Sequence, residues 1–176
     1  TLADLTGSEL SDCEVGTMEI TFSPNYDLKD SIRVNIDTAA SIGLLIQPLQ
    51  IAALGFPKGK KITVNLVGGG TFGKWAPSVS HLKHVTYKLF ERAGIRIKVK
   101  IKRHGFYPKG GALVEYSLFT PEEDLKPINL TSLGKINEMQ GEIICSKSLS
   151  HADVAQRIKD SAEKHLKANL NIGTNI

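Results

Sequence analysis

The chain has 176 residues, of which 41% are hydrophobic, and 22 Lys and Arg against 18 Asp and Glu give a net charge of +4. This size allows one domain with a buried core, or one domain plus part of a second. The two cysteines are far apart without CxxC spacing, and no apolar run is long enough for a bilayer, so a disulfide framework, a zinc knuckle and a membrane span are unsupported. We therefore expect a cytoplasmic protein with no membrane partner. The mild basic excess fits a polyanionic partner and, equally, an ordinary basic globular protein.

The N-terminal part predicts two strands. Residues 1–10 contain three leucines but no clear helix cap, so we expect the tail of an earlier element and regard the chain as a fragment. Residues 18–22 alternate between apolar and polar, which is strand spacing, and residues 24–27 (PNYD) predict a turn. A second alternating run, residues 32–36, predicts the next strand.

An apolar run at residues 41–54 (SIGLLIQPLQIAAL) is too long for a typical strand and predicts a buried helix. Pro48 lies inside it, so we expect a kink or a broken hydrogen bond there. Gln47 and Gln50 are the polar residues within the run, and buried amides need partners. Gln47 therefore either faces a ligand pocket or satisfies backbone groups that Pro48 leaves free.

A glycine-rich stretch follows the strand predicted at residues 62–66. Gly68, Gly69 and Gly70 precede Thr71, ahead of the next predicted helix. Such a loop can bind phosphate through backbone N–H groups and a helix N-terminus. The stretch matches neither the Walker A loop nor GxGxxG, and a plain strand-to-helix connection explains it as well.

The next helix is predicted to begin near Pro77 and to end at Gly94 as a C-cap. Its apolar positions recur at helical spacing: Val79, Leu82, Val85, Leu89 and Ala93. His81 and His84 lie three residues apart on the opposite side, a spacing that can hold a metal. No third ligand is evident nearby, so we expect surface histidines.

The clearest strand signal is the alternation of apolar and basic residues at positions 95–102. It predicts a half-buried strand with a basic outer face. Residues 109–111 (KGG) then lead into another predicted strand at residues 112–119. Residues 32–119 thus have the order β-α-β-α-β-β. This order predicts an α/β (α+β) fold with the helices packed on one face of a sheet.

The sharpest motif joins these last two strands, at residues 103–111 (RHGFYPKGG). Arg103, His104 and Lys109 are suited to contact phosphates, and Phe106 or Tyr107 to stack on a base. A basic β-hairpin with a proline-glycine turn is the alternative.

The C-terminal part predicts a loop at residues 121–127, a strand at 136–145 and a helix that starts at Ser150 with Asp153 in its first turn. The apolar stripe of this helix is Val154, Ile158, Ala162 and Leu166.

Several of these stretches, in this order, resemble the RNA 3′-terminal phosphate cyclase family. They are residues 37–43 (DTAASIG), 45–49 (LIQPL), 69–71 (GGT), 76–78 (APS), 104–111 (HGFYPKGG) and 127–131 (PINLT). The resemblance implies a large domain of repeated β-α-β-α-β-β units with a smaller α/β domain inserted. Residues 1–132 would then belong to the large domain, with one complete unit at 32–119, and residues 133–176 would begin the smaller one.

The resemblance also implies an activity, that of the enzyme branch found in archaea and bacteria. Such enzymes use ATP and a divalent metal, Mg or Mn, and a histidine takes AMP and passes it to an RNA 3′-phosphate. The neighbouring 2′-hydroxyl then displaces AMP to leave a 2′,3′-cyclic phosphate. We expect that histidine beyond Ile176, so none of the five histidines is assigned as catalytic and this part alone is expected to be inactive. The implied partner is an RNA 3′ end, and a homodimer is left open.

Residue roles follow from the same resemblance. Gln47 matches a glutamine near the ATP, Pro77 a proline that packs on adenine, and His81 an aromatic position that lines that pocket. The candidates for holding RNA or phosphates are Arg103, His104, Tyr107 and Lys109. No residue is assigned to a metal.

Three positions depart from the family pattern. Phe72 stands where an acidic or polar residue is usual, Ser80 where aspartate is common, and Ala112 in place of a third glycine. They leave room for a divergent member. One alternative is the non-catalytic branch that binds RNA in ribosome assembly, although HGFYP is more similar to the enzymes. A generic basic α/β module is another, and it predicts salt-dependent RNA binding that ignores ATP.

Overall fold

The structure is a computed structural model, and it describes residues 1–73, 75–169 and 173–176. It divides into two compact units, Thr1–Ile128 and Asn129–Ile176. Among the described residues, no helix combines the length and the apolar character that crossing a membrane requires.

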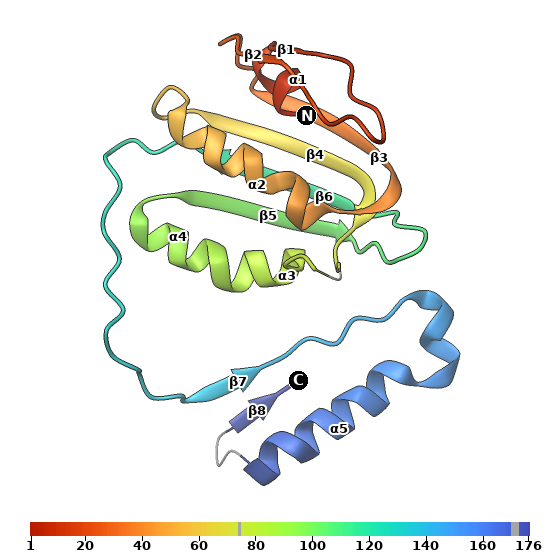
Figure 1. The fold of residues 1–176 in the computed structure, drawn as a ribbon. Helices are drawn as coiled ribbons and strands as arrows, with labels where there is room; N and C mark the ends of the chain where they lie inside the picture. The colour runs from red at the N-terminus through yellow and green to blue at the C-terminus, as the bar shows by residue number, and fades with distance from the viewer. Residues whose placement is uncertain (74, 170–172) are drawn as a thin grey trace. The chain divides into compact units, whose positions relative to one another are not determined.

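The first unit contains the predicted β-α-β-α-β-β order, which Figure 1 shows from β3 to β6. Its elements are α1 (Leu2–Thr6), β1 (Glu9–Leu10), β2 (Phe22–Ser23), β3 (Ser31–Ser41), α2 (Ile42–Ala52) with a 3₁₀ turn at Ala53–Gly55, β4 (Lys61–Gly70), α3 (Val79–His81), a π-helical turn at Leu82–Thr86, α4 (Tyr87–Ala93), β5 (Arg96–Arg103) and β6 (Leu113–Phe119). The prediction of an α+β fold is confirmed.

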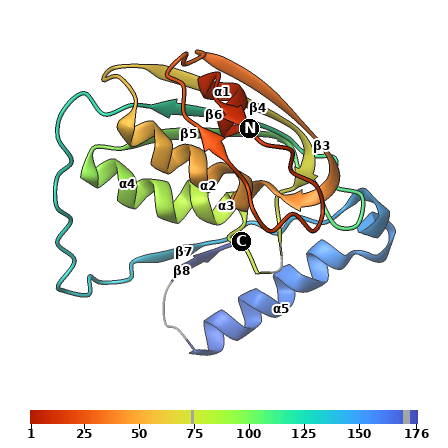
Figure 2. The same cartoon turned by 45° about the horizontal axis from the view of Figure 1, so that its top comes forward.

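Four strands form a mixed sheet in the order β3-β4-β6-β5. β3 and β4 are parallel, because α2 carries the chain back across the sheet between them, whereas β6 is antiparallel to both β4 and β5. Both views place α2 and α4 on the same face of this sheet (Figures 1 and 2).

The core lies between that face and the helices. Alternate residues of β4 and β6 are buried, in agreement with the period of two that a half-covered sheet requires. The fully buried side chains include Ile62, Val64, Leu66, Tyr116, Leu118, Ile42, Ile46, Leu49 and Val79. At about 1.5–3 kcal/mol for each large apolar side chain, this layer supplies most of the drive to fold.

Helix α2 is apolar on both sides but buried along one side only, so the prediction of a buried helix holds for that side alone. Ile46 is fully buried, but Leu44 is 51% exposed and Ile51 71% exposed. The sheet covers one face of α2, and a helix with a single neighbouring layer buries only one stripe. The helix continues through Pro48 to Ala52, although Pro48 donates no N–H to the carbonyl of Leu44.

The second helix differs from the predicted single stripe because a π-helical turn interrupts it at Leu82–Thr86. Val79 and Leu82 are buried as predicted, but the next buried residue is Tyr87, five positions on, while Val85 is exposed. A π turn inserts one extra residue, so the buried face is displaced along the sequence after it. Gly94 ends α4 in the left-handed conformation with φ 94°, which confirms the predicted C-cap.

The two helices also share a buried polar contact. The side-chain amide of Gln50 on α2 donates a hydrogen bond to the Tyr87 hydroxyl, which gives the buried Gln50 its expected partner. The rings of Tyr87 and Tyr116 meet edge to face. Burial raises the pKa of both tyrosine hydroxyls above the ordinary value.

The prediction of a strand at residues 18–22 is wrong, except that its last residue, Phe22, lies in a strand. Only Phe22–Ser23 forms a strand there, paired with Glu9–Leu10. Met18 and Ile20 are exposed. Alternation produces a strand only when its apolar side has a surface to cover, and these residues have none in the described structure.

The second unit contains β7 (Glu138–Gln140), a 3₁₀ helix (Lys147–Ala152), α5 (Val154–Asn169) and β8 (Gly173–Asn175), with β7 and β8 parallel. The strand predicted at residues 136–145 is thus only three residues long. The helix predicted from Ser150 begins at Val154 instead, because Asp153 adopts the left-handed conformation, which aspartate tolerates better than most residues, and ends the 3₁₀ helix.

The buried tyrosines predict a pH dependence of stability. In the unfolded chain both ionise near pH 10, whereas the folded state keeps them protonated because their pKa values are raised. Folding stability is therefore complete below pH 10 and falls above it, by about 1.4 kcal/mol per pH unit for each tyrosine. Tyr116→Phe should reduce this slope by about 1.4 kcal/mol per pH unit in urea unfolding measured between about pH 11 and pH 12, where the unfolded tyrosine is almost fully ionised.

The exposed Tyr26 provides the control, and Tyr26→Phe should leave the slope of the parent protein. An unchanged slope in Tyr116→Phe would contradict the buried position of Tyr116.

Candidate functional site

Four sequence motifs that are far apart along the chain meet at one end of the sheet: residues 37–43, 69–71, 76–78 and 104–111. Because β3 and β4 are parallel, their C-terminal ends lie together, with Ile36 beside Gly68 and Ser41 beside Gly70. β6 is antiparallel to β4, so its start and the preceding hairpin reach the same end, where Gly68 N–H donates to Ala112 O at 2.8 Å. This end of a sheet is where open α/β folds bind ligands.

The glycines at this end are required by close backbone packing. Gly68 has φ 95°, and a Cβ atom on it would lie 1.9 Å from the carbonyl oxygen of Ile36. A Cβ on Gly105 would lie 2.2 Å from the carbonyl oxygen of Gly69. Any side chain at these two positions would collide with backbone, so the glycine-rich loop and the hairpin interlock here.

Thr71 joins the glycine-rich loop to the hairpin. It is 1% exposed, and its Oγ1 donates to Gly105 O at 3.2 Å and lies 3.0 Å from Nδ1 of His104. Its backbone N–H donates to Gly105 O at 3.0 Å, and its carbonyl accepts from Val79 N–H at 2.9 Å. One buried residue therefore fixes the hairpin and the start of α3 together.

An aromatic cluster covers this junction. Phe72 stacks on His104 and on Phe106, with ring centroids 5.4 and 5.5 Å apart. Trp75, in the same loop, has φ 71° and is 89% exposed. Sequence analysis did not select Phe72 or Trp75 as site residues. The signal that marked Phe72 was its expected departure from the family pattern, and in the structure its ring stacks on two aromatic side chains of the hairpin.

The three predicted nucleotide residues lie on the helical side of this end. Gly43 packs directly on Pro77, since a Cβ on Gly43 would lie 2.2 Å from the Pro77 carbonyl oxygen. Gln47 follows Gly43 by four residues on the same face of α2, and it is half-buried. His81 lies on α3, after the N-cap Ser78, and is exposed. The fold thus places Gln47 on the side of α2 that faces the Pro77 segment, and it leaves His81 exposed on the helix that follows Pro77.

The residues predicted to hold RNA or phosphates lie in the hairpin. Arg103 is exposed, and its Nε donates to Gly111 O at 2.7 Å. Tyr107, at 87% exposed, and Lys109 reach solvent, while His104 is half-buried against Thr71. The hairpin itself closes by paired hydrogen bonds between Phe106 and Gly110. Three of the four predicted residues are therefore accessible to a ligand.

Ala112 and Ser80, the other two positions expected to depart from the family pattern, lie in different surroundings. Ala112 is fully buried and donates its N–H to Gly69 O, so its methyl group fills space beside Gly105. Ser80 is half-buried in α3.

Within the described residues, no group of three His, Cys, Asp or Glu side chains is placed to hold a metal ion. His81 and His84 are exposed on their helix, as predicted.

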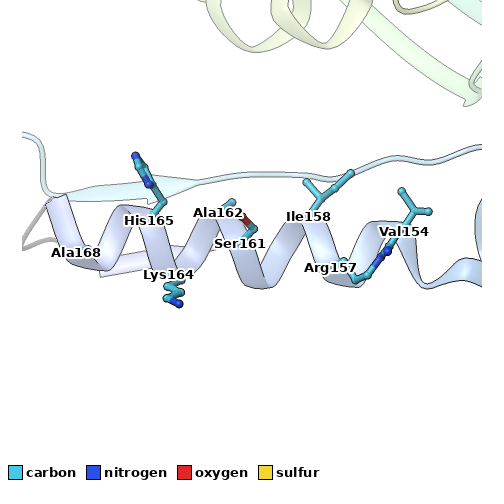
Figure 3. A pocket seen from close by; sticks show the side chains of 8 residues that line it. All are labelled: Val154, Arg157, Ile158, Ser161, Ala162, Lys164, His165 and Ala168. Atoms are coloured by element: carbon cyan, nitrogen blue, oxygen red, sulfur yellow. The ribbon is translucent and has the colours of Figure 1, made fainter.

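A separate hollow lies on the second unit and is lined by α5 alone. Figure 3 shows Val154, Ile158 and His165 projecting on one side of the helix, and Lys164 on the other. The hollow contains none of the predicted site residues.

A sequence model described as RNA 3′-terminal phosphate cyclase matches residues 1–173. The chain belongs to the RNA 3′-terminal phosphate cyclase family.

Three curated relatives carry the name RNA 3′-terminal phosphate cyclase. The protein from Thermococcus kodakarensis is 36% identical over 166 residues, 94% of this chain and 46% of the relative. Those from Thermococcus onnurineus (35% identity, 99% of this chain, 49% of the relative) and Desulfurococcus amylolyticus (33%, 88% and 43%) are similar. The chain spans about half the length of the curated relatives it matches.

The hydrogen bonds of the Thr71 hydroxyl should stabilise the hairpin of residues 104–111, and substitutions at Thr71 test this. Thr71→Val keeps the shape but leaves the His104 ring nitrogen and the Gly105 backbone without the hydroxyl, so we expect a loss of about 1–3 kcal/mol in the free energy of unfolding. Hydrogen exchange should accelerate in residues 104–111. Thr71→Ser keeps the hydroxyl and serves as the control, with little change in exchange. Equal effects of the two substitutions would show that the methyl group, and not the hydroxyl, is what matters.

Proposed function

We propose that this chain forms part of an enzyme that uses ATP to convert an RNA 3′-phosphate into a 2′,3′-cyclic phosphate. The observation that carries the proposal is the convergence of the family's motifs on one end of the sheet, where glycines, a buried threonine and accessible cations meet. The relatives' name, RNA 3′-terminal phosphate cyclase, supports the same reaction.

The proposed nucleotide site is the helical side of this end. Gln47 supplies an amide that can pair with a base edge, Pro77 an apolar surface for the ring, and His81 a polar rim. The packing of Gly43 on Pro77 supports this assignment, because it holds the α2 face that carries Gln47 against the Pro77 segment.

The proposed RNA site is the hairpin. Arg103 and Lys109 carry the positive charge that a terminal phosphate needs, Tyr107 offers an exposed ring for stacking, and His104 is oriented by Thr71. The Nε of Arg103 is already fixed by Gly111 O, which leaves the rest of the planar guanidinium group to meet the phosphate.

The reaction is proposed to pass through a histidine–AMP intermediate. We assign none of the five histidines of this chain as the nucleophile and propose that it lies outside residues 1–176. The divalent metal, Mg or Mn, is proposed to arrive with the ATP phosphates, because Mg²⁺ commonly binds through substrate phosphates and few protein carboxylates. The cytoplasm is the proposed compartment, and a homodimer stays a prediction.

The decisive experiment incubates the full-length protein with magnesium and ATP labelled on the α-phosphate. We expect label on the protein that survives base and is lost in acid, as a phosphoramidate should be. RNA with a 3′-phosphate should then discharge the label and gain a cyclic end. A folded protein that binds RNA but takes no label would instead be a non-catalytic member of the family, of the kind that acts in ribosome assembly.

Gln47 is tested by its effect on the ATP dependence of labelling. Gln47→Ala should raise the ATP concentration for half-maximal labelling several-fold, because one hydrogen bond to a neutral group contributes about 0.5–1.5 kcal/mol. Gln50→Ala is the matched control on the same helix. It removes the buried contact with Tyr87 and should lower the melting temperature without changing the ATP dependence. If the two variants shift the ATP dependence equally, Gln47 has no direct role.

A further inference from the structure

The face of the sheet opposite the helices carries a row of cations along β5. Ile97, Val99 and Ile101 turn toward the core, so the alternate residues lie on the other face and are exposed: Arg96, Lys98, Lys100 and Lys102. Alternate residues of a strand are about 6.6–6.8 Å apart, so the four charges form a regular line.

Neighbouring strands add to this basic face through the sheet register. Lys61 on β4 pairs with Phe119 on β6, which in turn pairs with Arg96 on β5. In the same way Arg33 on β3 is aligned across the sheet with Asn65, Glu115 and Lys100. The outward-facing alternate positions thus hold six exposed cations, namely Arg33, Lys61, Arg96, Lys98, Lys100 and Lys102, against the exposed Asp37 and the half-buried Glu115.

Three of these cations already have a partner on β6, one of them Lys98, whose Nζ lies 5.9 Å from the centre of the Phe119 ring. Lys102 Nζ contacts Glu115 Oε2 at 2.8 Å, and the Arg96 guanidinium lies 4.0 Å from the centre of the Phe119 ring. The hydrogen bond from Lys102 lowers the pKa of Glu115, and the charges of Lys102, Lys100 and Lys61 lower it further. Glu115 therefore responds to a field that several lysines produce together.

The row leads into the candidate site. β5 ends at Arg103, and the next residues form the hairpin that carries His104, Tyr107 and Lys109. A polyanion lying along β5 would reach the hairpin with one of its ends. Proteins usually intersperse both signs of charge on a solvated surface, whereas β5 presents one sign only and repels itself.

We propose that this basic sheet face binds the phosphate backbone of the RNA strand that leads to the 3′ end. The charge complementarity and the continuity of β5 with the hairpin carry the inference. The choice of RNA as the polyanion rests on the proposed function. Binding of this kind reads backbone charge and is independent of base sequence and of the terminal phosphate.

A different reason for lysines on β5 exists, because β5 is an edge strand of the sheet. Lysines on an edge strand hinder pairing with another chain. The experiment must therefore separate RNA binding from protection against self-association.

The test measures the affinity of the full-length protein for a fluorescein-labelled oligouridine with a 3′-hydroxyl, without ATP, over a series of salt concentrations. Lys98→Ala/Lys100→Ala should weaken binding several-fold at low salt. The slope of log affinity against log salt should fall by about 1.4, since each contact with a single-stranded phosphate contributes about 0.7. Oligouridine with a 3′-phosphate should lose affinity by the same factor.

Two further variants make the result specific. Lys83→Ala/Lys88→Ala removes the same charge from exposed positions on the helical layer and should leave the slope unchanged. Glu115→Gln removes the negative partner of Lys102 and should tighten binding with a steeper slope, which damage to the fold would not produce.

The outcomes separate the two proposals. Equal losses in the two double-lysine variants, or self-association of Lys98→Ala/Lys100→Ala with unchanged RNA affinity, would overturn the binding face. Labelling by ATP in the absence of RNA reports on the proposed chemistry alone, and it should be the same in Lys98→Ala/Lys100→Ala as in the parent. A protein that takes no label yet shows the predicted salt slopes would keep the binding face and lose the cyclase reaction.

Discussion

The close approach of three backbone segments at one end of the sheet is the constraint on which the rest of this structure depends. The carbonyl of Ile36 occupies the space that a side chain on Gly68 would need, and the carbonyl of Gly69 does the same for Gly105. The end of β3, the end of β4 and the hairpin after β5 are joined only because these residues have no Cβ. The candidate contacts of the hairpin are positioned by this junction.

The buried hydroxyl of Thr71 fixes the orientation of the hairpin at this junction. It bonds to the hairpin backbone and to the His104 ring, while the Thr71 carbonyl holds the first turn of α3. A fully satisfied buried polar group specifies one arrangement of its neighbours, since any other leaves a desolvated donor or acceptor. The aromatic rings of Phe72 and Phe106 then cover the junction. Phe72 is thus part of the packing at this junction.

The sheet separates two chemical environments. Its inner face packs against α2 and α4 and ends at the proposed nucleotide residues, whereas its outer face is polar and carries the cations of β5. Both faces meet at the hairpin, because β5 runs directly into it. Under the proposed function, the nucleotide and the RNA end would therefore meet near this hairpin.

The sequence by itself determined the β-α-β-α-β-β order, the alternation along β5, the C-cap at Gly94 and the family. Each of these depends on local periodicity, on the conformational freedom of glycine or on a motif of adjacent residues. The tertiary structure decided that the motifs meet, that Thr71 bonds to the hairpin, and that Phe72 stacks on Phe106, because these contacts join residues distant along the chain. It also decided where local patterns fail. The alternating residues 18–22 form almost no strand because they lack a surface to cover, and the buried stripe after Leu82 is displaced because a π-helical turn adds a residue to the helix.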